Sequence, residues 1–119
     1  MLSVKEKGIL IYICNHCKRI EQKLVGINKE MFDEDDDIKE IICFNIFQIG
    51  ELAKGLTPEF ISKYGNMPWK QIKGMRDVIG HKYGTIDINK VWETATNDIV
   101  PLRKYCESIL IENQQKKAA

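Results

Sequence analysis

The chain of 119 residues is 44% hydrophobic and 29% charged, which is enough to bury the core of one globular domain without disulfides or metal. Its formal net charge of +1 excludes a uniformly basic protein and an acidic tail, so any attraction for a charged partner comes from a local patch. No run approaches the roughly 18 apolar residues of a membrane span. The short apolar run near the N-terminus lacks the cleavage site of a signal peptide. We therefore expect a cytoplasmic protein without membrane association and with reduced cysteines.

The first predicted helix covers residues 4–25, where apolar residues recur every three or four positions before a glycine. It carries a Cys-x-x-Cys pair, Cys14 and Cys17. A zinc site needs a second pair of ligands, and Cys43 and Cys106 stand far apart in the chain. Positions 14 and 17 share one face of a helix, so small buried thiols are the alternative that we favour. We expect no metal site and no cofactor.

An acidic run, "DEDDD", follows the first helix and could in principle supply carboxylates to a metal. It stands, however, where the next helix is expected to begin. Asp37 and Glu40 fit a capping box, and the neighbouring carboxylates favour the positive end of the helix dipole. We interpret the run as a helix start.

The helix predicted for residues 38–55 is apolar nearly all round in its middle, whereas a surface helix of a monomer needs only one apolar stripe. Either this helix is central, or its second face meets another protein. A homodimer would satisfy the second alternative, with Gly50 allowing close approach of a partner helix. The apolar residues are Ile41, Ile42, Cys43, Phe44, Ile46, Phe47 and Ile49.

Two shorter helices are predicted next. Thr57 and Pro58 are typical of a helix start, and Gly65 is typical of its end. Pro68 opens a further helix that runs into a polar, glycine-containing stretch.

The last predicted helix begins at a capping Asp87 and runs to about residue 112, with a kink at Pro101. Residues 113–119 have the composition of a frayed C-terminal tail. Residues 1–112 therefore read as a single all-α domain, an antiparallel bundle of about five helices.

The stretch "GMRDVIGHKYG", residues 74–84, concentrates polar groups that a helix built only for packing would not carry. On a continuous helix, Arg76 and Tyr83 share one face about 10 Å apart, while His81 lies off that face. Either the glycines break the helix so that His81 turns back, or Arg76 and His81 meet their copies across a two-fold axis.

Local charge favours phosphate as the ligand of this stretch, because only one acidic residue, Asp77, opposes its cations. Arginine binds phosphate oxygens through a planar fork, and histidine exchanges protons near neutral pH. Together they suit RNA cleavage by the ribose 2′-hydroxyl, which needs no metal. The alternative is structural, with Arg76 paired or capping and His81 satisfied at a helix end. The cations between residues 63 and 84 are Lys63, Lys70, Lys73, Arg76 and Lys82.

"RDVIGHKY" matches the Arg-x4-His-x-Tyr motif of HEPN-domain toxins, the partners of minimal nucleotidyltransferase (MNT) antitoxins. The segments "FNIFQIGELAKGL", "MPWKQIKGMRDVIGHKYG" and "VWETATNDIVPLRKYCESIL" resemble landmarks of that family in the same order. The resemblance implies an all-α bundle, a homodimer and a composite site that joins residues of both subunits. It also implies a metal-independent ribonuclease toxin.

By position in this motif, the resemblance gives Arg76 and His81 the catalytic roles and Asp77 a supporting one. Lys73 and Lys82 are the nearest cations for RNA phosphate, and Tyr83 is the tyrosine that a cognate antitoxin would modify with AMP. The alternative for Tyr83 is a structural role, as a half-buried side chain that packs against the helix end.

Two functions thus remain open. One is a toxin ribonuclease neutralised by its antitoxin. The other is a non-catalytic nucleotide- or RNA-binding HEPN module that assists a nucleotidyltransferase. The intact Arg76–His81 pair favours the enzyme, because a scaffold needs no proton-transfer group.

Overall fold

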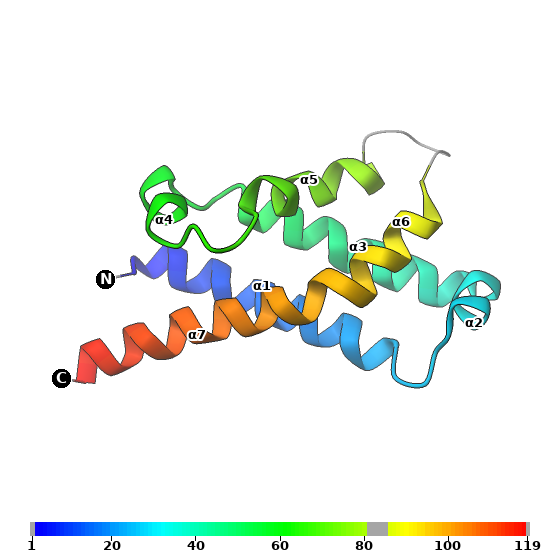
Figure 1. The fold of residues 1–119 in the computed structure, drawn as a ribbon, viewed down its shortest axis with the longest axis horizontal. Coiled ribbons are helices and arrows are strands. Elements are labelled where there is room, and N and C mark those ends of the chain that lie inside the picture. Colours follow the sequence, from blue (N-terminus) through cyan, green and yellow to red (C-terminus); the bar gives the residue numbers. More distant parts are fainter. Residues whose placement is uncertain (1, 81–85, 119) are drawn as a thin grey trace.

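The protein is a bundle of helices, and the computed structural model describes residues 2–80 and 86–118, with the side chains of 2–75 and 86–114. No strand occurs in these residues, so the predicted all-α class is confirmed. Figure 1 shows the long helices running side by side along the molecule. In chain order the elements are α1 (Val4–Lys23), α2 (Lys29–Glu34), α3 (Asp36–Ala53), α4 (Pro58–Lys63), α5 (Trp69–Gly80), α6 (Ile88–Glu93), the π-helical segment η1 (Thr94–Asp98) and α7 (Ile99–Ala118).

Side-chain caps start most of these helices. Ser3 and Glu6 form a capping box on α1, with both hydrogen bonds at 3.0 Å. Thr57 caps α4 and also donates to Glu6 at 3.0 Å, which ties the starts of α1 and α4 together. Asp87 caps α6, as the sequence predicts. Gly26 follows α1 with φ of +73°, a conformation that favours glycine.

The start of α3 differs from the prediction. The chain forms one additional short helix, α2, capped by Asn28, and this shifts the cap of α3 upstream. Asp35, in extended backbone, accepts a hydrogen bond from the Ile38 N–H at 3.0 Å. The predicted capping box of Asp37 and Glu40 is therefore wrong, although Asp37 does lie in the acidic first turn.

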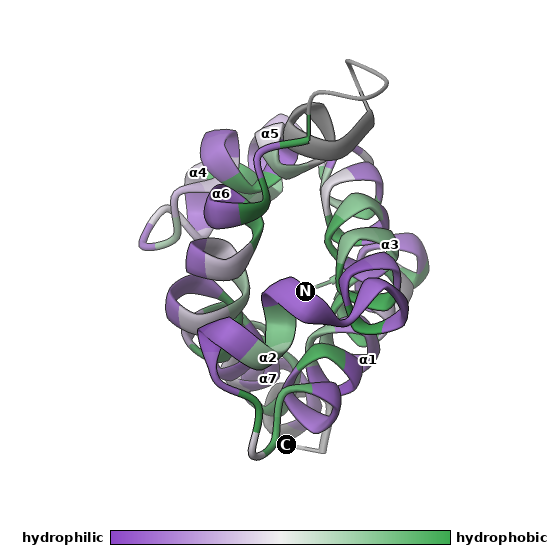
Figure 2. Cartoon of the chain, turned by 90° about the vertical axis from the view of Figure 1, so that its right-hand side faces the viewer, coloured by the Kyte–Doolittle hydropathy of each residue, from purple (hydrophilic) through white to green (hydrophobic). Residues whose placement is uncertain are grey.

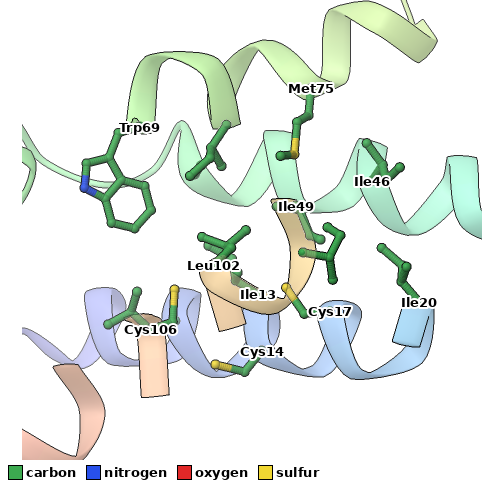
Figure 3. Packing of buried hydrophobic residues seen from close by; sticks show 14 of the residues in the cluster. Ile13, Cys14, Cys17, Ile20, Ile46, Ile49, Trp69, Met75, Leu102 and Cys106 are labelled. Carbon is green, nitrogen blue, oxygen red and sulfur yellow. The ribbon is translucent and has the colours of Figure 1, made fainter. Parts of the chain in front are cut away.

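Helix α3 occupies the centre of the bundle, where it packs against α1, α2, α5 and α6. Viewed along the bundle, hydrophobic residues concentrate on the sides of the helices that face one another (Figure 2). Figure 3 shows side chains from α1, α3, α5 and α7 meeting in one core. Ile42, Ile46 and Ile49 of α3 are each at most 1% exposed.

The central position explains most of the apolar surface that suggested a dimer. Ile46 and Gly50 are buried within their own chain, so neither is free to meet a partner helix, which corrects the reading of Gly50. Phe44 is the exception, because 56% of it is exposed on the outward side of α3. Only the strip around Phe44 stays available for a second copy.

The last helix is not continuous α-helix. α6 passes through the π-helical turn η1 into α7, and Pro101 lies in the first turn of α7. Proline lacks the backbone N–H that would donate to the carbonyl four residues earlier in an α-helix. A π-helical turn before the proline accommodates this missing hydrogen bond. The predicted irregularity is thus a widened turn just before the proline.

The C-terminal segment also differs from the prediction, because α7 continues to Ala118 instead of fraying from residue 113. Asn113 donates to the Tyr64 hydroxyl at 3.1 Å and accepts from the Leu2 N–H at 3.3 Å. These bonds join the two ends of the chain, which lie at the same end of the molecule (Figure 1). The tail was predicted from composition alone, and composition carries no information on the hydrogen bonds that Asn113 forms with Tyr64 and Leu2.

Between α1 and α7, Arg103 bridges two carboxylates. Its guanidinium donates to Glu21 at 2.6 and 3.0 Å and to Glu107 at 2.6 Å. The hydrogen bonds to Glu21, followed by those to Glu107, raise the pKa of Arg103.

Within the described residues, no helix is both long and apolar enough to cross a membrane.

A pair of substitutions on α3 tests this placement. Ile46→Asp puts a carboxylate where the side chain is 1% exposed and should cost roughly 3 kcal/mol or more of unfolding free energy. Phe44→Asp, two residues away on the exposed side, should change the unfolding free energy of a single subunit by less than about 1 kcal/mol, at a protein concentration too low for copies to associate. Urea unfolding followed by circular dichroism measures both. Equal destabilisation would contradict the central position of α3.

Candidate active site

Helix α5 is held firmly at its N-terminal end. The Trp69 indole N–H donates to the Tyr64 carbonyl at 2.7 Å, and the ring packs edge-on against Phe60 at 5.6 Å and against Tyr105 at 6.2 Å. Trp69 itself is 3% exposed. Such a buried aromatic with a satisfied N–H fixes where the helix starts and in which direction it runs.

Further along α5, Ile72 and Met75 bury their side chains at 2% and 7% exposure. Together with Trp69 they recur at three-residue steps, which places the buried side of α5 against α3 and the α7 region. The next residue after Met75 is Arg76. The anchored helix therefore carries the first residues of the motif, Arg76 and Asp77, in its C-terminal half.

The structure describes the position of some of the predicted site residues and not of others. Arg76 and Asp77 lie in α5, but their side chains are outside the description. His81, Lys82 and Tyr83 lie outside the described residues altogether. Both alternatives for bringing Arg76 and His81 together thus stay open. The end of α5 and the start of α6 lie at the same end of the bundle, so they bracket the motif (Figure 1).

Three of the five cations in the predicted basic stretch have described side chains. Lys70 is exposed and Lys73 half-buried, and neither forms an ion pair with another described residue. Lys63 lies with its Nζ 5.5 Å from the centre of the Tyr64 ring. Lys73 precedes Arg76 by three positions, so the two residues are neighbours on the helix surface.

The other histidine of the chain, His16, has a structural environment. Its Nδ1 lies 2.8 Å from the Asn45 Oδ1, and the Asn45 amide in turn donates to the Ile41 carbonyl at 2.7 Å. Since Oδ1 of Asn45 accepts, His16 Nδ1 carries the proton. His16 lies between α1 and α3, on a different pair of helices from the motif.

The cysteines behave as packing residues. All four are buried and free, and burial raises the pKa of the Cys17 and Cys43 thiols. Neutral buried thiols are poor metal ligands. Across the part of the chain that is described, no group of three or more histidines, cysteines and carboxylates could hold a metal.

A cavity of about 420 Å³ opens beside α5, between the N-terminal half of that helix and η1. Its floor is apolar and includes Ile72, Met75 and Pro101. Polar side chains form its rim, and sequence reasoning missed all of them: Asn66, Gln71, Asn97 and Asp98. The one available signal was the polar "TND" before a proline, because such a stretch interrupts the apolar pattern of the last helix.

The fold and the motif define a class, an all-α HEPN-type bundle with an Arg-x4-His sequence at the end of one helix. A family model described as ribonuclease HepT-like matches residues 13–109. The chain therefore belongs to the ribonuclease HepT-like family, and this membership supports endoribonuclease activity. The HEPN-type ribonuclease family predicted from the sequence is confirmed.

Curated relatives agree with this assignment. "Putative RNase TTE0752" of Caldanaerobacter subterraneus subsp. tengcongensis is 34% identical over 101 residues, covering 85% of this chain and 90% of the relative. "Putative RNase MJ0125" of Methanocaldococcus jannaschii is 30% identical over 110 residues, 92% of this chain and 95% of the relative. "Probable ribonuclease HepT" of Thermococcus cleftensis is 31% identical over 61 residues, 51% of this chain and 56% of the relative. No solved structure matches the chain.

Proposed function

We propose that this protein is a toxin ribonuclease that cleaves RNA without a metal ion, with Arg76 and His81 as its catalytic residues. The observation that carries the proposal is that the Arg-x4-His motif begins at Arg76 on α5, a helix anchored by Trp69, in a chain of the HepT-like family.

In the proposed reaction the ribose 2′-oxygen attacks the neighbouring phosphorus, and the bond from phosphorus to the 5′-oxygen of the next nucleotide breaks. The 2′-hydroxyl loses a proton and the leaving 5′-oxygen gains one, so that a 2′,3′-cyclic phosphate and a 5′-hydroxyl result. His81 is the proton-transfer group. Arg76 stabilises the additional negative charge on the phosphate oxygens, and Lys73 and Lys82 attract the substrate.

Removing either catalytic side chain should abolish cleavage. We expect His81→Ala and Arg76→Ala each to reduce the rate by about 100-fold or more, without change in circular dichroism. The control is Lys104→Ala, an exposed lysine on α7, which should cleave like the parent. A fluorogenic RNA assay with and without EDTA measures the rates. Full activity of the double alanine variant would refute the assignment, and loss of activity with EDTA would refute the metal-free mechanism.

We also propose that two copies join around the exposed strip of α3. Helices α3 and α5 run antiparallel, so the N-terminal half of α3, which carries Phe44, lies beside the C-terminal half of α5 (Figure 1). A two-fold axis near Phe44 would bring two α5 ends toward each other. This arrangement supports a composite site in which Arg76 of one copy acts with His81 of the other.

Mixing two inactive variants tests the composite site. When equal amounts of the Arg76→Ala and His81→Ala variants exchange subunits, about half of the dimers contain one copy of each variant. One of the two sites in such a mixed dimer holds both intact residues, so about a quarter of wild-type activity should return. Sedimentation measures the dimer, and Phe44→Asp should weaken it. A well-folded wild-type monomer at micromolar concentration, or no recovery after exchange, would contradict the dimeric site.

The cognate partner that we propose is an MNT-type nucleotidyltransferase antitoxin that modifies Tyr83. A phenol in water has a pKa of about 10, so a tyrosine side chain is in general a poor acid or base at neutral pH, and another role is more natural for it. Its oxygen would attack the α-phosphorus of ATP and release pyrophosphate, while the partner supplies magnesium and accepts the phenolic proton. The attached AMP places a negative phosphodiester beside the basic motif and competes with RNA phosphate.

Intact-mass spectrometry after co-expression with the neighbouring nucleotidyltransferase frame tests this regulation. The mass should rise by one or more AMP units, and Tyr83→Phe should remain unmodified. Tyr12→Phe, on an exposed tyrosine of α1, is the matched control and should be modified like the parent. Undiminished modification of Tyr83→Phe would place the switch at another residue.

The second candidate function is a non-catalytic module that binds a nucleotide or RNA for a nucleotidyltransferase. The exposed Lys70 and the half-buried Lys73 suit it as well as they suit an enzyme. The cleavage assay separates the two, because the module would bind RNA with unchanged affinity after His81→Ala and would never cleave it.

A further inference from the structure

We infer that the cavity between α5 and η1 binds a single base of the RNA substrate and selects guanine. This inference rests on the proposed ribonuclease function and adds a specificity site to it. The cavity is lined from α5, from the segment that precedes α5, and from η1 and the first turn of α7. Segments far apart in the sequence thus converge on one ligand-sized space of about 420 Å³.

The floor of the cavity suits a flat ring. Ile72 and Met75 present the small exposed parts of otherwise buried side chains, and Met67 and Pro101 complete the apolar lining. The thioether of methionine is polarizable and makes favourable contacts with aromatic rings. Unpaired bases of RNA are commonly held by stacking on such surfaces, with their hydrogen-bonding edges read by side chains.

The rim supplies groups that could read such an edge. Asn66, Gln71 and Asn97 each bring a side-chain amide from a different segment, and Asp98 brings a carboxylate. No hydrogen bond or ion pair engages these four side chains within the described part of the chain. Each amide is both a donor and an acceptor, so the rim can match a base without first breaking internal bonds.

The charge of the lining decides between a base and a phosphate. No lysine or arginine is among the described residues that line the cavity, and Asp98 would repel an anion. A carboxylate instead accepts hydrogen bonds, and its two oxygens match two adjacent N–H donors. Among the four RNA bases, guanine offers such a pair on its Watson–Crick edge. Uracil presents one N–H between two carbonyl oxygens, which a carboxylate repels.

The cavity also lies at the right place for a substrate. Ile72 precedes Arg76 by four residues, and residues four apart on a helix are surface neighbours with Cβ atoms about 6 Å apart. A base in the cavity and a phosphate at the motif can therefore belong to the same or adjacent nucleotides. Its second wall is η1, and π-helical turns often occur at functional sites.

The test measures binding in a His81→Ala background, so that cleavage cannot interfere. The probes are short fluorescein-labelled oligouridylates with one central G, A, C or U, followed by fluorescence anisotropy. We expect the central G to bind roughly tenfold more tightly than the other three. Asp98→Asn and Gln71→Met are near-isosteric changes of exposed residues, and each should reduce this preference to about twofold or less.

Gln22→Met is the matched control, because Gln22 is an exposed glutamine on α1 outside the cavity. It should keep the full preference. Equal binding of the four probes, or a preference that Asp98→Asn and Gln71→Met leave intact, would overturn the base pocket while leaving the ribonuclease proposal standing. A preference for another base would overturn the guanine assignment. If no probe binds the parent, the proposed function itself fails and the pocket fails with it.

Discussion

The burial of α3 is the constraint on which the other helices depend. Nearly every side of this helix is covered, with α1 on one flank and α5 on the other. Ile42, Ile46, Ile49 and Asn45 of this helix are almost completely removed from water, and the Asn45 amide is satisfied by His16 and by the Ile41 carbonyl. A central helix with so little exposed surface fixes the positions of its neighbours, because interiors pack too densely to let them slide.

The placement of α5 follows from this constraint. Along this short helix, the residues that pack against the core are separate from the residues proposed for the site. The N-terminal half packs through Trp69, Ile72 and Met75, and these buried contacts set its direction. The C-terminal half carries Arg76 and Asp77, where the motif begins. Functional groups often stand at the ends of elements that a rigid scaffold positions. Here the scaffold is the contact between α3 and α5.

The sequence predicted the helix class, most caps and the long helices because apolar periodicity and capping residues are local signals. It failed at Asp37, since a cap depends on where the preceding turn ends, and α2 moved that point to Asp35. It failed at Asn113, since the partners Leu2 and Tyr64 are far away in the chain. The polar residues of the cavity rim were not predicted for the same reason. Asn66 and Asp98 are meaningful only once α5 and η1 lie side by side.

The near-neutral charge of the protein limits how it can recognise RNA. Proteins that bind nucleic acid through many phosphate contacts gain affinity by releasing counterions, and they need many cations to do so. A chain with a net charge of +1 and one short basic stretch has few such contacts to offer. Pairing two copies doubles the local cations near the motif. The remaining affinity has to come from the bases, through stacking and edge contacts, which depend less on salt than phosphate contacts do. Of the surfaces described, the one that combines an apolar floor with unpaired polar groups beside the motif is the cavity between α5 and η1.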